Sequence, residues 1–202
     1  PSAPLKMYFS DFDDNGQTES VIAIKKNNEY YPINNFDELS EQITIVRKKF
    51  STYNAFAGRP IEDVFSKEQL AKATLNELTH LQSGYLKNED GKYTFIPFNF
   101  YLQLSPIKDF LVYDFDYDGQ DEVLVGGNYF GVKPFQGRFD SFPGAMIYDT
   151  EKFISGNNLG LDFHKKSLRN LEIIEVAENK YLIAVFNDNA VQIYELIKCF
   201  DE

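Results

Sequence analysis

Short segments in which apolar and polar residues alternate recur along most of the chain, and this pattern predicts a protein built mainly of β-strands. The predicted strands cover residues 4–9, 20–24, 30–33, 83–86, 92–97, 98–104, 110–113, 123–128, 145–148, 173–176, 181–186 and 190–196. Turns rich in Asn, Asp and Gly separate several of them, for example Asn27-Asn28 and Asn88-Glu89-Asp90-Gly91. Such turns are typical of β-hairpins, so antiparallel sheets are expected.

One region has the periodicity of a helix instead. Its apolar residues recur every three or four positions, at Phe36, Leu39, Ile43, Val46 and Phe50. This spacing places them on one side of a single helix. Asn35 is the expected N-cap, with Glu38 completing a capping box, and a second short helix is expected to begin at Ser66 with Gln69 in the same role. We therefore predict a helical insertion over roughly 35–75.

Two acidic segments between predicted strands share one pattern. The first is Asp11-Phe12-Asp13-Asp14-Asn15-Gly16-Gln17-Thr18-Glu19, and the second is Asp114-Phe115-Asp116-Tyr117-Asp118-Gly119-Gln120-Asp121-Glu122. Both have oxygen-bearing side chains at positions 1, 3, 5 and 9, Phe at position 2, Gly at position 6 and Gln at position 7. Two loops that match at so many positions indicate an internal repeat.

This pattern supplies what a calcium ion requires, namely six to eight hard oxygen ligands at about 2.3–2.6 Å, several of them anionic. The predicted side-chain ligands are Asp11, Asp13, Asn15 and Glu19 in the first loop and Asp114, Asp116, Asp118 and Glu122 in the second. Gln17 and Gln120 would each add a backbone carbonyl. In a helix-loop-helix calcium site a Glu at position 12 closes the cage, but position 12 here is Val125, so Glu122 is expected to close it. The alternative is an ordinary Asp-Gly hairpin turn without an ion.

Composition narrows the function classes. The chain has 202 residues, of which 43% are hydrophobic and 16% aromatic, ample for a packed core. Its net charge of −11 disfavours nucleic acid and anionic membranes as partners and agrees with bound cations. The single cysteine, Cys199, excludes an intrachain disulfide, and no apolar run is long enough to span a bilayer. The sequence begins at Pro1 without a signal sequence, so we expect a processed or partial product of a longer chain.

A stretch rich in aromatic residues and glycine, Tyr129 to Gly144, follows the second loop and its strand. The residues predicted to contact a partner are Tyr129, Phe130, Phe135, Arg138, Phe139 and Asp140. Aromatic and arginine side chains dominate many protein interfaces, which favours this interpretation. Two alternatives are that the rings stack on sugars, or that they cover the end of a sheet while Arg138 pairs with Asp140.

No arrangement typical of an enzyme is present in the sequence. His80 and His164 have neither metal-pair nor nucleophile-base spacing, and there is no Gly-x-Ser-x-Gly motif or phosphate-binding loop. The carboxylates have metal-loop spacing and are not two isolated acids on separate strands. We therefore expect a protein that is not a catalyst.

Taken together, several segments resemble the FG-GAP/VCBS repeat proteins, in particular the bacterial ASPIC/UnbV-like group. They are the second acidic loop with Val123-Leu124-Val125-Gly126-Gly127-Asn128, then Gly137-Arg138-Phe139-Asp140, and Asn187-Asp188-Asn189-Ala190-Val191-Gln192-Ile193-Tyr194. The region from Tyr31-Pro32 through Ile61-Glu62-Asp63-Val64-Phe65 to Leu70 is similar to the helical insertion of that group. The chain departs from the family pattern in having Glu at position 9 of both loops, where Asp is commoner.

The resemblance implies the C-terminal portion of an integrin-α-like β-propeller whose acidic loops each hold one Ca²⁺. The chain would then comprise a blade with the first loop (1–34), the helical insertion (35–75) and further blades with the second loop (76–202). Because propellers close with about four to eight blades, the remainder of the propeller is an expected partner.

The resemblance also implies a secreted or lipid-anchored protein of the bacterial outer-membrane surface. The function expected from it is a non-catalytic, calcium-stabilised module for protein–protein interaction in a surface assembly. The alternative is a glycan-binding module or an accessory part of a polysaccharide-degrading enzyme, since related repeats accompany such enzymes.

Overall fold

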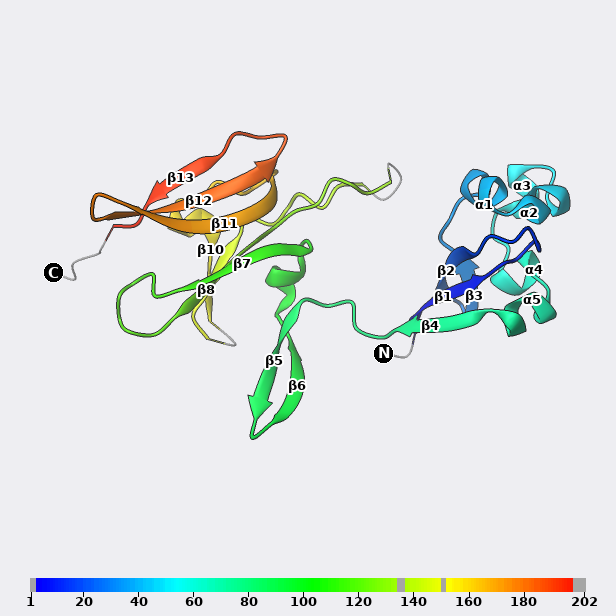
Figure 1. Ribbon diagram of the computed structural model, residues 1–202, viewed down its shortest axis with the longest axis horizontal. Coiled ribbons are helices and arrows are strands. Elements are labelled where there is room, and N and C mark those ends of the chain that lie inside the picture. The colour runs from blue at the N-terminus through cyan, green and yellow to red at the C-terminus, as the bar shows by residue number, and fades with distance from the viewer. Residues whose placement is uncertain (1–2, 134–136, 150–151, 198–202) are drawn as a thin grey trace. The chain divides into compact units, whose positions relative to one another are not determined.

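The computed structural model describes residues 3–133, 137–149 and 152–197 of the chain. These residues are mostly in strands, which form several antiparallel sheets accompanied by few helices (Figure 1). The prediction of a mainly β protein is therefore confirmed. The described strands form no closed barrel. The chain divides into two compact units, Pro1–Leu81 and Gln82–Glu202, which are described separately below.

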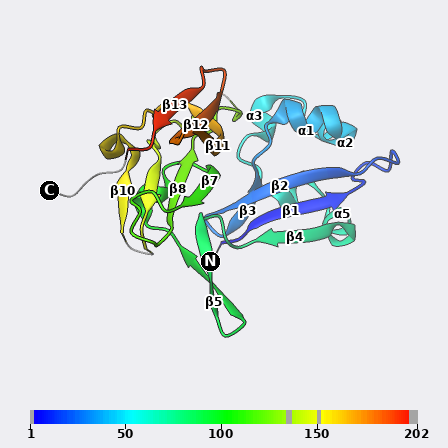
Figure 2. The same cartoon turned by 60° about the vertical axis from the view of Figure 1, so that its left-hand side comes forward.

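The first unit contains a four-stranded antiparallel sheet in the order β3-β2-β1-β4 (Figures 1 and 2). Its strands are β1 (Leu5–Ser10), β2 (Glu19–Lys26), β3 (Glu29–Pro32) and β4 (Thr74–Leu78). The predicted turn between β2 and β3 is formed by Asn27 and Asn28, whose φ angles are 50° and 69°. Asparagine tolerates this left-handed conformation better than most residues, which is why it suits the turn.

Five short helices follow in the same unit. They are α1 (Phe36–Gln42), α2 (Thr44–Lys49), α3 (Tyr53–Phe56), α4 (Ile61–Val64) and α5 (Lys67–Lys72). Both predicted capping boxes are present, one formed by Asn35 with Glu38 and the other by Ser66 with Gln69.

The single helix predicted across residues 36–50 is wrong, because Ile43 has an extended backbone and divides it into α1 and α2. The break lies where Asp13 reaches the chain. Its Oδ2 accepts hydrogen bonds from the backbone N and from Oγ1 of Thr44, each at 2.7 Å. This carboxylate starts a new helix at Thr44, in competition with continuation of α1.

The core of the first unit lies between the helices and one face of the sheet. Its buried residues are Tyr8, Phe12, Val21, Ala23, Leu39, Ile43, Val46, Phe50, Ile61, Val64 and Phe65. Phe12, at position 2 of the first acidic loop, is only 2% exposed, and its ring centroid lies 4.4 Å from that of Phe65. The acidic loop is therefore anchored in the core.

The second unit begins with a two-stranded hairpin, β5 (Gly84–Glu89) and β6 (Lys92–Pro97). A strand was predicted next, over residues 98–104, and this prediction is wrong. The segment forms the 3-10 helix η1 (Phe100–Gln103), because the Asn99 side chain accepts hydrogen bonds from the backbone N–H groups of Tyr101 and Leu102.

Two further sheets are found among the described residues of this unit. The first has the order β10-β9-β8-β7 and the second has the order β11-β12-β13. Their strands are β7 (Ile107–Tyr113), β8 (Glu122–Gly127), β9 (Ala145–Ile147), β10 (Phe153–Ser155), β11 (Ser167–Val176), β12 (Asn179–Asn187) and β13 (Gln192–Glu195), with the 3-10 helix η3 (Gly156–Leu159) after β10.

The two sheets pack against each other through a buried apolar cluster that includes Leu124, Leu168, Leu171 and Leu182. At Gly126 a Cβ atom would lie 2.2 Å from Cδ2 of Leu168, so a larger residue here would require the buried Leu168 side chain to shift. Among the described residues, no helix has the length and apolar character needed to cross a membrane.

Candidate metal centres

The two acidic loops have similar backbone conformations and share several internal hydrogen bonds. In both, the position 1 carboxylate accepts from the N–H of the glycine at position 6, and the position 5 side chain accepts from the N–H of position 7. The pairs are Asp11–Gly16 (2.8 Å), Asp114–Gly119 (3.1 Å), Asn15–Gln17 (2.7 Å) and Asp118–Gln120 (2.7 Å). Positive φ angles occur at positions 4 and 6 of both loops, at Asp14 (55°), Gly16 (86°), Tyr117 (64°) and Gly119 (89°). The repeat seen in the sequence is thus also a repeat of local structure.

The glutamate at position 9 is buried in both loops. Glu19 is 7% exposed and Glu122 is 3% exposed. One carboxylate oxygen of each accepts a hydrogen bond from the backbone N–H of the phenylalanine at position 2, from Phe12 at 3.1 Å and from Phe115 at 2.9 Å. This bond connects the end of each loop to its beginning and was not anticipated from the sequence.

Three carboxylates gather in each loop. The groups are Asp11, Asp13 and Glu19 in the first unit and Asp114, Asp116 and Glu122 in the second, and within each group the oxygens lie within 4.8 Å of one another. Carboxylates at this spacing repel one another in the absence of a cation. In addition, Asp13 Oδ1 and Asp114 Oδ1 are buried and have no hydrogen-bond partner. Because an unpaired buried oxygen is unfavourable, both loops are suited to hold a metal ion.

The other predicted ligands are arranged differently. At position 5, Asp118 is exposed, and its carboxylate accepts hydrogen bonds from the backbone N and from Nε2 of Gln120. Asn15 and Gln17 are exposed at the corresponding positions of the first loop. The structure therefore brings together the carboxylates of positions 1, 3 and 9, while the position 5 side chains hold the backbone of the turn.

Burial raises the pKa of the Glu122 carboxyl above its ordinary value. The hydrogen bond from Phe115 lowers this pKa, and the nearby charges of Asp116, Asp118 and Asp114 raise it. Negative charge is thus unfavourable at this position while the loop is free of cations. A bound cation would reverse that preference, because it stabilises the ionised carboxylate.

The first loop is held in place by contacts with distant residues of its unit. The Phe12 ring packs on Phe65, and the Phe12 carbonyl accepts a hydrogen bond from Nε2 of Gln69 at 2.7 Å. Asp13 contributes one oxygen to the N-terminus of α2 through Thr44 and leaves Oδ1 in the carboxylate group. Asp13 therefore has two structural roles.

The second loop is anchored more lightly. Phe115 packs at the edge of the cluster between the two sheets, and its ring centroid is 5.3 Å from that of Tyr113. The Tyr113 hydroxyl accepts a hydrogen bond from Nζ of Lys180 on β12, and the same Nζ lies 5.8 Å from the Tyr117 ring centroid. These contacts connect the loop to the neighbouring sheet.

The residues predicted to contact a partner lie on an extension between β8 and β9, which runs away from the sheets of its unit (Figure 1). Tyr129 and Phe139 form an antiparallel bridge, with N···O distances of 2.8 and 3.2 Å. The Arg138 guanidinium lies 3.9 Å from the Phe130 ring centroid, a cation–π geometry. Phe135 lies outside the described residues.

Asp140 ends the extension. Its backbone carbonyl accepts a hydrogen bond from the N–H of Lys165 at 3.1 Å. The side chains of Arg138 and Phe139 remain exposed, the latter to 41%. Exposed aromatic and arginine side chains on such an extension are compatible with contact to a partner.

A buried asparagine at the base of this extension was not identified from the sequence. Asn128 is fully buried, with φ of 70°. Its Nδ2 donates to the carbonyls of Phe142 (2.8 Å), Phe163 (3.1 Å) and Lys166 (3.1 Å), and its Oδ1 accepts from Phe142 N at 3.0 Å. The two N–H groups of the side-chain amide are thus shared among three distant carbonyls, and the Phe163 carbonyl also accepts from Lys166 N at 3.1 Å. The Gly-Gly-Asn sequence at the end of β8 is the signal that could have pointed to a left-handed residue here.

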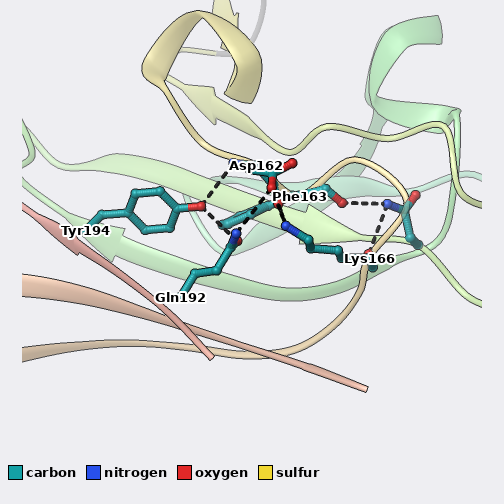
Figure 3. A network of polar contacts seen from close by, with 6 residues as sticks. Asp162, Phe163, Lys166, Gln192 and Tyr194 are labelled. Atoms are coloured by element: carbon teal, nitrogen blue, oxygen red, sulfur yellow. Dashed lines mark hydrogen bonds and ion pairs between the residues drawn. The ribbon is translucent and has the colours of Figure 1, made fainter. Parts of the chain in front are cut away.

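A second polar network connects β13 to the segment after η3 (Figure 3). Asp162 forms an ion pair with Lys166, and the Asp162 backbone N–H donates to the Tyr194 hydroxyl at 3.0 Å. Gln192 completes the network when its amide is oriented to satisfy all its partners, with Oε1 accepting from Lys166 Nζ at 2.8 Å. Because the charged groups pair with each other, the network holds the segment in place.

The two histidines do not belong to either carboxylate group. His80 and His164 are exposed, and only acidic residues make up the groups found among the described residues. A comparison of the chain with protein-family models, curated proteins and solved structures found no match. The functional assignment therefore depends on the residues themselves and on their geometry.

Proposed function

We propose that this protein is a non-catalytic, calcium-stabilised segment of a β-propeller of the FG-GAP/VCBS repeat type. The proposal depends above all on one observation: two loops with a shared pattern of hydrogen bonds each gather three carboxylates, and one oxygen of each group is buried and has no hydrogen-bond partner. In this proposal the segment serves as a protein–protein interaction module in a secreted or cell-surface assembly.

The chemistry of the donor set favours calcium over other metals. The carboxylate groups contain no histidine and no cysteine, the ligands that zinc prefers. Carboxylate, amide and carbonyl oxygens from one short loop match calcium, whereas magnesium demands a stricter octahedral geometry and retains more water. The complete proposed sets are Asp11, Asp13, Asn15, Gln17 (carbonyl) and Glu19, and Asp114, Asp116, Asp118, Gln120 (carbonyl) and Glu122.

The proposed role of the ion is structural. Each loop connects two paired antiparallel strands, β1 with β2 and β7 with β8, and position 9 pairs with the residue just before position 1. A cation among the three carboxylates would remove their mutual repulsion and fix the strand connection. Because a ligand that binds only the folded state stabilises it by RT ln(1 + [L]/Kd), a calcium concentration of 100 times Kd contributes about 2.7 kcal/mol at a single site.

The sheet arrangement supports the assignment to a propeller segment. The sheet β10-β9-β8-β7 is a four-stranded antiparallel meander, and the sheet β11-β12-β13 packs on one of its faces. Blades of a propeller are four-stranded sheets that pack face to face. The remainder of the propeller would be supplied by further chain, and the extension carrying Arg138 and Phe139 would contact the external partner.

Calcium titration tests this proposal directly. We expect isothermal titration calorimetry to detect two sites in the chelator-treated protein, and the double variant Asp114→Asn with Asp116→Asn to retain one. A matched control, Asp90→Asn with Asp188→Asn, changes two turn aspartates outside the acidic loops and should retain both sites. Absence of calcium binding in the folded wild-type protein would overturn the proposal.

A further inference from the structure

The second unit contains a groove that takes no part in the proposed calcium sites. It lies between the β5–β6 hairpin and the strands β7, β8 and β9, and its volume is about 740 Å³. This volume falls within the roughly 300–1,000 Å³ typical of pockets that hold small organic ligands. The groove lies on the face of the sheet opposite to the one that packs on β11 and β12, because side chains alternate between the two faces of a strand.

Apolar side chains form the walls. Leu111 and Leu124 point into the cluster between the two sheets, whereas their neighbours Phe110, Val112 and Val123 line the groove. Phe110 is 62% exposed and Val112 is 49% exposed, although both are apolar residues of β7. A ligand in the groove would therefore remove considerable apolar surface from water, which favours binding.

The hairpin supplies the opposite wall. Its Tyr85 and Phe95 rings line the groove, together with Phe98 just after β6. At Gly84 a Cβ atom would lie 2.7 Å from Cζ of Phe95 and 2.3 Å from the Ile96 carbonyl oxygen. Glycine at this position thus allows the Phe95 ring to lie across the hairpin backbone. Most of this wall therefore belongs to the paired hairpin and the residues next to it.

The charged groups that line the groove are all acidic. They are Asp121 and Asp149, and no lysine, arginine or histidine lines it in the part of the chain that the structure describes. Asp149 also contacts the backbone N and the side chain of Lys152. Asp121 is exposed at position 8 of the second acidic loop and is not one of the proposed calcium ligands. Aromatic ring faces and carboxylates both attract cations.

We propose that this groove binds a small organic cation, an ammonium compound with an aromatic or branched alkyl body. The apolar body would lie between Phe95 and Phe110, and the cationic head would lie near Asp121. An anion of the same shape would be repelled by the two carboxylates and by the net charge of −11. A second copy of the chain carries that same negative charge, which opposes its association with the acidic rim. The remaining blades of the proposed propeller are placed elsewhere than on this face, because the β5–β6 hairpin already forms one wall of the groove there.

The test compares three compounds with the same apolar body: 4-phenylbutyltrimethylammonium, 4-phenylbutanol and 4-phenylbutanoate. We expect the cation to bind the calcium-saturated wild-type protein at least about tenfold more tightly than the anion, with the alcohol between them. Amide chemical shifts in NMR spectra should change at Phe110, Val123 and Ile147. Equal affinities for cation and anion, or shift changes confined to other regions, would overturn the proposal.

Two variants distinguish the contribution of charge to binding from that of the apolar contacts. Asp121→Asn should weaken binding of the cation several-fold and leave the alcohol unaffected, whereas Val112→Trp should fill the groove and abolish binding of both. Asp188→Asn, in a turn outside the groove, is the control and should bind like wild type. Sedimentation velocity identifies the competing occupant: concentration-dependent dimers that Val112→Trp abolishes would assign the groove to a second copy. Because calcium binding is titrated separately, failure of either proposal is recognised independently.

Discussion

Glu122 closes the second acidic loop onto Phe115, since its Oε2 accepts a hydrogen bond from the Phe115 backbone N at 2.9 Å. Glu19 makes the equivalent bond to Phe12 in the first loop, at 3.1 Å. A glutamate at position 9 therefore has two roles: one oxygen accepts the hydrogen bond that holds the start of the loop, and the other is available to a cation. The shorter side chain of aspartate would have difficulty meeting both, which gives a physical reason for glutamate at this position.

Removal of calcium should destabilise the protein. We expect chelation by EDTA to lower the free energy of unfolding by about 2–3 kcal/mol per site, relative to calcium at about 100 times its Kd. Chemical denaturation with and without calcium measures this difference. Magnesium at the same concentration is the control and should restore less stability, because its coordination is more rigid. A stability that is the same in calcium and in EDTA contradicts a structural role for the ion.

The raised pKa of Glu122 has a consequence for the ion-free protein. A proton on this carboxyl binds more tightly in the folded state than in the unfolded chain, where the pKa is about 4.3. The stability that it contributes is fully present below the unfolded pKa and is lost as pH rises through the folded pKa. Because Glu122→Gln cannot ionise, the melting temperature of the variant in EDTA should increase relative to wild type between about pH 4 and pH 7.

In saturating calcium at pH 7 the wild-type protein should instead be more stable than Glu122→Gln, because the ion stabilises the ionised carboxylate and glutamine lacks the charge. Thermal unfolding of both proteins over the pH series, in EDTA and in calcium, provides the measurement. If the difference in melting temperature between variant and wild type in EDTA were the same at both ends of the pH series, the raised pKa of Glu122 would be refuted.

Asp13 and Asp116 occupy position 3 of the two loops but differ in one contact. Asp13 accepts two hydrogen bonds from Thr44 at the start of α2, whereas Asp116 accepts one from the Asp118 backbone N at 3.1 Å. Asp13→Ala should therefore cost about 1–2 kcal/mol even in EDTA, through loss of a helix cap. Asp116→Ala should have a much smaller effect under the same conditions. Equal losses of stability in urea denaturation would argue against the capping role of Asp13.

Local signals in the sequence predicted many elements of the fold. The capping boxes at Asn35 and Ser66 act within one helical turn, and the Asn27-Asn28 turn acts within one hairpin, so neighbouring residues suffice to specify them. The break at Ile43 was missed because it depends on Asp13. This residue lies 31 positions before Thr44, the residue that it contacts. Tertiary contacts of this kind leave no trace in hydrophobic periodicity.

The candidate site, too, could be predicted from the sequence only in part. The spacing of Asp114, Asp116 and Glu122 was sufficient to predict that their carboxylates gather, because one tight turn determines their positions. The hydrogen bond from Phe115 to Glu122 and the use of Asp118 by the turn depend on burial and backbone direction, which spacing does not encode. The carbonyl contacts of Asn128 reach 14 to 38 residues along the chain and were likewise beyond sequence reasoning.

Asn128 should be among the residues most sensitive to substitution. Asn128→Ala would remove the side-chain donor to the carbonyls of Phe142, Phe163 and Lys166, of which Phe163 keeps the bond from Lys166 N, and would place alanine at a positive φ. We expect a loss of about 3 kcal/mol or more. Asn189→Ala removes a single exposed hydrogen bond in a turn and should cost less than about 0.5 kcal/mol. Urea denaturation of the two variants compares them, and similar losses would contradict the importance of the buried network.

The turn between β11 and β12 should be open to stabilisation. Ala177 and Glu178 form its two central residues, with φ angles of 50° and 74°. Left-handed conformations are unfavourable for both residue types, whereas a type I′ hairpin favours Asn followed by Gly. The double variant Ala177→Asn with Glu178→Gly should therefore raise the free energy of unfolding by about 1–2 kcal/mol. The same measurement on Asp90→Ala should give a loss, because Asp90 with Gly91 is already suited to the equivalent turn between β5 and β6. A destabilised Asn-Gly variant would mean that Ala177 or Glu178 makes contacts worth more than the relief of backbone strain.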